Sequence, residues 1–186
     1  MNGQSPNLSS ISRDVGASRM TVERYFEVLN DTLVGAWLPA WRPRAKVKEA
    51  SSPKFYLFDP GVARALAGTL SRPPTPDERG PLLEALIYSE LRAFLQDRLP
   101  TGNLNYWRTP NGSEVDFILD LGDRVLGIEV KSSPRYRREE VRPLRELRKS
   151  GILHEAIVVY GGESDQLDGE IRVLTVSSFA RWLRAE

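Results

Sequence analysis

The sequence predicts an α/β protein in which a small N-terminal helical unit precedes a mixed β-sheet flanked by helices. Three observations predict this fold class. Short apolar runs with strand periodicity recur in the C-terminal half, and an amphipathic helical stretch separates two of them. The run AIVVY at 156–160 is continuously apolar, which is typical of a strand covered on both faces. The resulting order of strand, helix and strand implies a crossover connection.

Composition sets limits on the class of protein. A chain of 186 residues with 40% hydrophobic and 27% charged residues suits one large or two small globular domains. No apolar run is long enough to span a bilayer and the first residues do not resemble a signal peptide, so we expect no membrane partner and a cytoplasmic location. The absence of cysteine excludes disulfides and thiolate metal sites. A net charge of +1 is no nucleic-acid signature in itself.

Residues 1–68 are expected to form a winged-helix-like unit. The polar residues 1–7 are predicted to be a frayed end. Helices are predicted at 8–15 and, with Ser18 as the cap, from there to about Leu29. The run KFYLF at 54–58 is a predicted strand that completes the unit.

The two predicted helices, joined by a glycine-containing turn, are typical of a helix-turn-helix motif. Arg19 and Arg24 on the second helix are therefore candidate contacts to nucleic-acid phosphates. Glu23 and Glu27 on the same helix oppose that role, so contact with a protein partner stays an alternative.

Residues 69–80 are rich in proline and charge, which predicts a linker. Pro81 then suits the first turn of a helix that runs to about Leu95. Glu84 lies among the apolar positions of this helix, which is unusual for a carboxylate. The other positions predicted on its buried face are Leu83, Leu86, Ile87, Leu91 and Phe94.

A predicted hairpin, with strands at 114–119 and 125–130, carries the most informative residues. Strand alternation places Glu114 and Asp116 on one face and Val115, Phe117 and Leu119 on the other. If the strands pair across the turn, Asp116 meets Glu129, and Lys131 lies close by. Carboxylates among apolar strand residues are costly to bury without a cation, and hard oxygen ligands suit Mg²⁺ or Mn²⁺.

An aspartate on one hairpin strand followed by E-x-K on the next resembles the PD-(D/E)XK, or restriction-endonuclease-like, nuclease superfamily. The ordered segments GPLLEALIYSEL, YWRT, EVDFIL and IEVKSS are more closely similar to the C-terminal region of prokaryotic AAA-type ATPases. In those proteins a P-loop ATPase precedes a winged helix and a nuclease-like core.

The resemblance implies that residues 81–186 are a PD-(D/E)XK nuclease-like domain that hydrolyses DNA phosphodiesters with Mg²⁺ or Mn²⁺. It implies Asp116, Glu129 and Glu84 as metal ligands, with Glu90 as the second choice for the carboxylate on the helix. It also implies Lys131 as a further catalytic residue. No G-x-x-x-x-G-K-[ST] motif occurs, so an ATPase domain is expected only as a partner.

Arginines near the predicted site are candidate phosphate contacts. Arg108 leads into the hairpin, and a helix predicted over 135–149, with Pro143 near its start, carries a surplus of four positive charges. This segment predicts either a phosphate-tracking surface or a solvated face with internal ion pairs. The residues assigned to nucleic acid here are Arg108, Arg135, Arg138 and Arg142. A last helix is predicted after 171–176, capped by Ser177.

Two other functions stay open at this point. The chain could be a catalytically silent regulatory or interaction module of an ATPase, in which the carboxylate and lysine set is structural. It could also be a sequence-specific DNA-binding regulator that acts through its helical unit.

Overall fold

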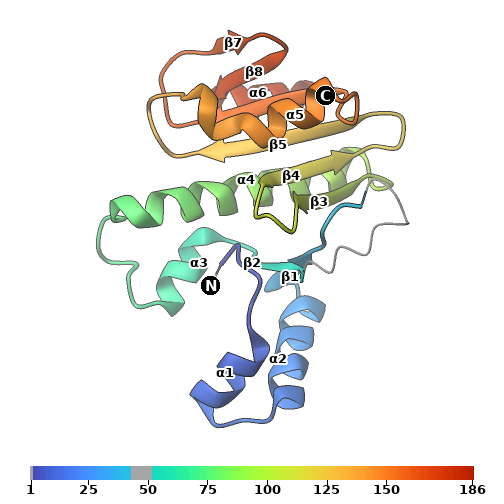
Figure 1. Cartoon of the computed structure of the whole chain (residues 1–186). Coiled ribbons are helices and arrows are strands. Elements are labelled where there is room, and N and C mark those ends of the chain that lie inside the picture. The colour runs from blue at the N-terminus through green and yellow to red at the C-terminus, as the bar shows by residue number, and fades with distance from the viewer. Residues whose placement is uncertain (1, 43–51) are drawn as a thin grey trace.

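The computed structural model describes residues 2–42 and 52–186 (Figure 1). Figure 1 shows α1 and α2 projecting from one end of the molecule, with the main sheet at the other end. The elements in chain order are α1 (Leu8–Val15), α2 (Arg19–Asp31), β1 (Gly35–Leu38), β2 (Lys54–Leu57), α3 (Pro60–Leu66), α4 (Pro76–Arg98), β3 (Asn103–Arg108), β4 (Glu114–Asp120), β5 (Val125–Lys131), the 3₁₀ helix η1 (Arg138–Val141), α5 (Arg142–Lys149), β6 (Glu155–Tyr160), β7 (Gln166–Asp168), β8 (Ile171–Thr175) and α6 (Val176–Ala185).

The main sheet is mixed, as the sequence predicts. Its strand order is β3-β4-β5-β6-β8-β7. The first three strands are antiparallel, whereas β5, β6 and β8 run parallel and β7 is an antiparallel edge strand that the sequence did not reveal. The α5 crossover joins the parallel strands β5 and β6, which confirms the predicted strand, helix and strand unit.

Two apolar clusters hold helices against the two faces of this sheet. The first unites α4 and α6 with one face, through residues such as Leu91, Phe117 and Phe179. The second packs α5 on the opposite face, with Leu144 and Val158 at its centre. Three of the positions predicted on the buried side of α4, Ile87, Leu91 and Phe94, are buried. Leu83 is partly buried and Leu86 is 39% exposed.

The N-terminal helices follow the sequence closely. α1 spans the predicted range, and the Ser18 side chain caps α2 by accepting a hydrogen bond from the Thr21 N–H at 3.1 Å. The expectation of a frayed end is wrong for residues 2–4. The Gly3 N–H donates to the Phe55 carbonyl at 2.9 Å, and the Phe55 N–H donates to the Gln4 carbonyl at 2.9 Å. These bonds cover an edge of β2 that would otherwise stay unpaired.

The strand pair β1–β2 shares its hydrophobic core with the main sheet. Leu38 and Tyr56 belong to the same buried cluster as α4 and Phe117. The chain after β1 also reaches β3, because the Trp41 N–H donates to the Tyr106 carbonyl at 2.6 Å. The predicted units 1–68 and 81–186 are therefore packed against each other through one continuous core.

The helix expected to begin at Pro81 begins at Pro76, so the last part of the predicted linker 69–80 is helical. Pro76 takes the first turn, where its missing N–H costs nothing. The Thr75 N–H donates to Glu78 Oε2 at 2.9 Å, so the backbone N–H of the N-cap residue has a hydrogen-bond partner. The hydrogen bond from Arg72 lowers the pKa of Glu78 to about 2. The sequence prediction placed the start of the helix at Pro81 because the residues before it are rich in proline and charge and were assigned to a linker.

Two further boundaries differ from the prediction. The last helix begins at Val176 and is capped by Thr175, whose side chain accepts from the Ser178 N–H at 3.1 Å, rather than by Ser177. The segment 135–149 forms η1 followed by α5, because Pro143 stands in the first turn of α5 and the α-helix starts only there.

Replacing Gly80 by alanine should stabilise the protein by about 0.5–1 kcal/mol. Gly80 lies inside α4, and a Cβ there would meet only Ser132 Oγ, at an ordinary 3.7 Å. The change in the free energy of unfolding is measured by urea denaturation, in which the dependence on urea concentration (the m value) should stay unchanged. Gly112→Ala is the control, since Gly112 has φ +85° and alanine should destabilise it. No gain at Gly80 would mean that residues 76–80 do not contribute a stable helical turn.

Candidate functional site

The candidate site lies where the ladder between β4 and β5 ends. The last backbone pair is Phe117 with Ile128. Beyond it, the Val130 N–H donates to Asp116 Oδ2 at 2.8 Å, and the Asp116 N–H points to Glu129 Oε2 at 3.4 Å. Side-chain carboxylates thus take the place of the next backbone hydrogen bonds between β4 and β5. The structure brings Asp116 and Glu129 together at this point, where the two strands open.

A β-bulge in β4 aims Asp116 into the opening. The pairing with β3 passes from Asn105–Ile118 to Trp107–Val115, so β4 has one more residue than β3 in this interval. Val115 consequently packs with the α5 cluster, whereas Phe117 packs with the α4 cluster. The predicted common face for Val115 and Phe117 is wrong, because a bulge interrupts the alternation. Asp116 lies between these two oppositely directed residues.

Lys131 lies beside the pair of acids. Its Nζ donates to Glu129 Oε1 at 2.7 Å. Glu129 is only 6% exposed, whereas the Lys131 side chain keeps 30% of its surface in contact with solvent. The charge of the buried Glu129 is therefore balanced by Lys131, whose partly exposed side chain is accessible to a ligand.

A second lysine, which the sequence analysis missed, enters the site from β2. Lys54 Nζ lies 3.0 Å from Glu84 Oε1 and 2.6 Å from Glu114 Oε1. Lys54 is 7% exposed. The fully buried Tyr56, on the same strand, donates its hydroxyl to Glu84 Oε1 at 2.5 Å. The available signal was a lysine leading an otherwise apolar strand, KFYLF, which periodicity alone does not flag.

These four carboxylates, Glu84, Glu114, Asp116 and Glu129, together with Lys54 and Lys131, are called the carboxylate–lysine cluster below. Burial and then the charges of Glu129 and Glu84 raise the pKa of Asp116 well above its usual range. Burial also raises the pKa of Glu129, although Lys131 opposes that shift. Burial lowers the Lys54 pKa, but Glu84, Asp116 and Glu114 more than offset it, so Lys54 stays charged. Around Asp116, burial and the two neighbouring acids therefore outweigh the opposing effect of Lys54.

The donor set suits a hard divalent cation. Among residues 2–42 and 52–186, no three or more His, Asp or Glu side chains are grouped so that they alone could hold a metal ion. Mg²⁺ nevertheless needs only one or two protein carboxylates, because it keeps several of its waters. Asp116 and Glu129 supply that number at the strand opening, so the residues present fit such an ion.

The arginines assigned to nucleic acid do not form one surface. Arg108 lies at the cluster, with its Nε 3.6 Å from Glu114 Oε2. Arg19 and Arg24 lie on α2, at the end of the molecule opposite α5 (Figure 1). Arg19 also pairs with Glu23 at 2.8 Å, and Arg24 is exposed. Arg108 is therefore adjacent to the carboxylate–lysine cluster, whereas Arg19 and Arg24 lie on a distant helix.

The basic segment around α5 is largely ion-paired. Arg142 pairs with Glu146 at 2.7 Å, and Arg138 lies 3.4 Å from Asp168, on the unpredicted strand β7. Asp168 also accepts hydrogen bonds from Arg145 and Tyr136, which lower its pKa. Ion pairs are what one of the two alternatives for this segment predicted, although Asp168 lies outside the segment. Arg135, outside these pairs, is exposed just after β5.

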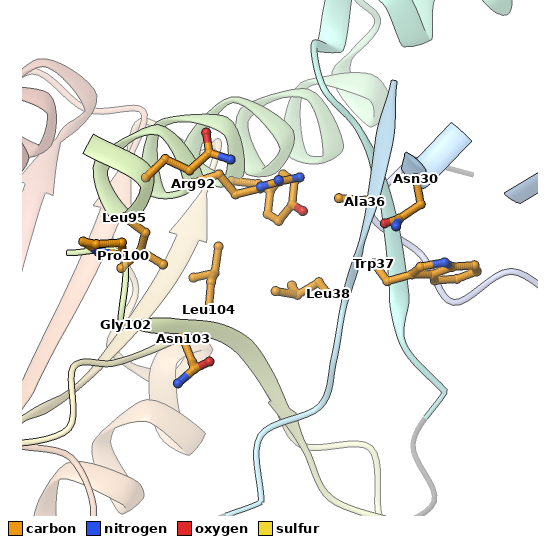
Figure 2. Close-up of a pocket in the computed structure, with 12 residues that line it drawn as sticks. Asn30, Ala36, Trp37, Leu38, Arg92, Leu95, Pro100, Gly102, Asn103 and Leu104 are labelled. Atoms are coloured by element: carbon orange, nitrogen blue, oxygen red, sulfur yellow. The ribbon is translucent and has the colours of Figure 1, made fainter. Parts of the chain in front are cut away.

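A separate cavity of about 470 Å³ lies between α2, β1, α4 and β3 (Figure 2). Figure 2 shows Trp37 and Asn30 on one side of it and Arg92 and Leu95 on the other. Its lining residues include no carboxylate. The chemistry expected of this chain therefore rests on the carboxylate–lysine cluster and not on this cavity.

The fold and the site together define an α/β chain that carries a carboxylate–lysine cluster at the end of two strands of a mixed sheet. The chain belongs to the family described as Domain of unknown function (DUF4143), which it matches over residues 79–179. Residues 1–72 match a second family, Domain of unknown function (DUF8612).

Relatives extend the comparison to most of the chain. The uncharacterized proteins Rv2008c of Mycobacterium tuberculosis and Mb2031c of Mycobacterium bovis are each 30% identical over 167 residues, which is 87% of this chain. The chain spans only 36% of the length of each relative. No solved structure matches the sequence. In the described part of the chain, no helix has the length and apolar character needed to cross a membrane.

Proposed function

We propose that the chain hydrolyses nucleic-acid phosphodiester bonds, with DNA as the favoured substrate, in a reaction that depends on Mg²⁺ or Mn²⁺. The observation that carries the proposal is the meeting of Asp116 and Glu129 at the opened end of the β4–β5 ladder, with Lys131 on Glu129. Burial and the neighbouring charges of Glu129 and Glu84 raise the pKa of Asp116, and a bound cation would offset that cost of ionisation.

Each member of the cluster has a distinct role in this proposal. Asp116 and Glu129 would hold the ion, and Glu84 is the third acid at hand. When bound, the ion would polarise the phosphate and lower the pKa of a water molecule. Lys131 would orient that water or stabilise negative charge that develops on the phosphate. Arg108, whose side chain is 50% exposed, would hold a neighbouring phosphate.

The proposal includes the finer architecture that the sequence suggested. The sheet with α4 and α5 on its two faces would be a PD-(D/E)XK core, and α1, α2 and the β1–β2 pair would be a winged-helix-like unit. The likeness of the segments to the C-terminal region of AAA-type ATPases makes an ATPase domain the expected partner. The matched region is 36% of the length of each relative, which leaves room for such a domain in their own chains.

The test is a gel assay with single-stranded, duplex and branched DNA in the presence of Mn²⁺ or Mg²⁺. Cleavage is expected with metal and not with a chelator. Lys131→Met should reduce the rate by about 10²-fold or more, because it removes the cation beside the buried Glu129. Arg98→Met is the matched loss of an exposed cation, at the far end of α4 from Glu84, and should leave cleavage unchanged. Metal-independent cleavage, or equal rates for both variants, would refute the proposal.

One observation favours a second function, a catalytically silent regulatory module of an ATPase. Lys54 already neutralises Glu84 and Glu114, which would suit a purely structural cluster. That function predicts no cleavage of any DNA form, together with binding to an ATPase domain that Lys131→Met leaves intact. The same gel assay therefore separates the two functions.

A further inference from the structure

Lys54 occupies a position that is unusual for a lysine of the N-terminal unit. Its Nζ lies between carboxylates from two other elements, 3.0 Å from Glu84 Oε1 on α4 and 2.6 Å from Glu114 Oε1 on β4. Its charge also lies 5.3 Å from the centre of the Tyr106 ring. Two acidic oxygens thus converge on one positive charge, as carboxylates do around a bound cation.

The charge of the cluster decides what else it can bind. Four carboxylates face two ammonium groups, Lys54 and Lys131, which leaves two negative charges. One divalent cation would balance these two charges when all four carboxylates are ionised. Arg108 adds little to this balance, since it is half exposed and lies 3.6 Å from Glu114, so that solvent screens it.

We propose that Lys54 is a positioning residue that takes the place of a second metal ion, so that the site binds one divalent cation and not two. The inference rests on the proposed function, because it assumes that Asp116 and Glu129 hold an ion. It also makes the N-terminal unit part of the site, since β2 supplies the ammonium that holds Glu84 and Glu114 in place.

Tyr56 supports this position of Lys54. Its hydroxyl donates to the same Glu84 Oε1 that Lys54 contacts, and its ring stacks on Tyr88 with centroids 4.1 Å apart. Lys54 and Tyr56 are two residues apart on β2, so strand alternation puts both on the α4 side. The strand therefore presents one charge and one hydroxyl to Glu84 from a rigid, buried support.

The experiment counts Mn²⁺ ions per chain by isothermal titration calorimetry, with electron paramagnetic resonance of free Mn²⁺ as an independent count. The wild-type chain and Lys54→Arg should bind one ion. Lys54→Gln, which removes the charge but keeps a hydrogen-bond donor, should bind two. The double variant Lys54→Gln with Glu84→Gln should bind one again, because the second ion loses a ligand. Arg98→Met is the control and should behave as the wild-type chain.

The outcomes separate the two proposals. If the wild-type chain binds no ion, the metal-dependent function fails and this inference fails with it. If the wild-type chain binds two ions, or Lys54→Gln binds one with unchanged affinity, only the inference is overturned. Should Lys54→Gln be unfolded without metal, Mn²⁺ should restore its folding, because the ion replaces the missing ammonium. Absence of rescue, with Lys54→Arg folded, would also overturn the inference.

Discussion

Replacing Asp116 by asparagine is expected to abolish cleavage and, in the same protein, to raise the free energy of unfolding. In the proposed function this carboxylate holds the ion, so we expect the rate to fall by about 10²-fold or more. Ionised Asp116 is opposed by burial and by two neighbouring acids, which is why its pKa is raised. A raised pKa of an acid means that its ionised form lowers stability at neutral pH. Asparagine removes that cost and can still accept the Val130 hydrogen bond.

The expected gain is about 0.5–2 kcal/mol, the usual size for a functional residue exchanged for a neutral one. Denaturation with urea at pH 7 without metal measures it. Added Mn²⁺ should then stabilise the wild-type chain and leave the variant unchanged.

Asp120→Asn is the matched control on the same strand. Asp120 accepts hydrogen bonds from Trp41 Nε1 at 3.3 Å and from the Gly122 N–H at 3.1 Å, outside the cluster. The Asp120→Asn substitution should leave cleavage unchanged and should not raise the free energy of unfolding. If Asp116→Asn lost stability as well as activity, the carboxylate would stabilise the fold. The expectation that its charge lowers the free energy of unfolding would then be wrong.

The second large effect is expected from Tyr56→Ala, which should destabilise the main sheet although Tyr56 belongs to the N-terminal unit. Tyr56 is fully buried in the cluster that contains α4, stacks on Tyr88 and lies 6.2 Å from Phe117 between ring centroids. Removing a buried aromatic side chain of this kind costs about 3–5 kcal/mol. Hydrogen exchange of the α4 and β4 amides should accelerate accordingly.

Phe58→Ala is the comparison for this change. Phe58 directly follows β2 but is 54% exposed, so its loss should change stability by no more than about 0.5 kcal/mol. If Tyr56→Ala accelerated exchange in α1, α2 and β2 but not in α4 and β4, the N-terminal unit and the sheet would unfold separately. The continuous core would then not make the two parts of the chain unfold in one cooperative transition.

The sequence was most informative where contacts are local. The α1 range and the Ser18 cap depend on spacing within a few residues, and both are confirmed. The proximity of Asp116, Glu129 and Lys131 was also foreseeable, because a short turn joins their two strands and fixes which residues face each other. The sequence by itself thus determined the mixed α/β class and the core of the candidate site.

Tertiary structure decided everything that depends on segments far apart in the chain. Lys54 meets Glu84 across 30 residues and Arg145 meets Asp168 across 23, and no periodicity records such pairs. The bulge at Asp116 was equally hidden, since it arises from the register between β3 and β4 and not from either strand alone. Alternation and helical spacing describe one element at a time, whereas the charge balance of a buried site depends on which elements pack together. For that reason the contacts of the second lysine, Lys54, with Glu84 and Glu114 could be identified only in the folded chain.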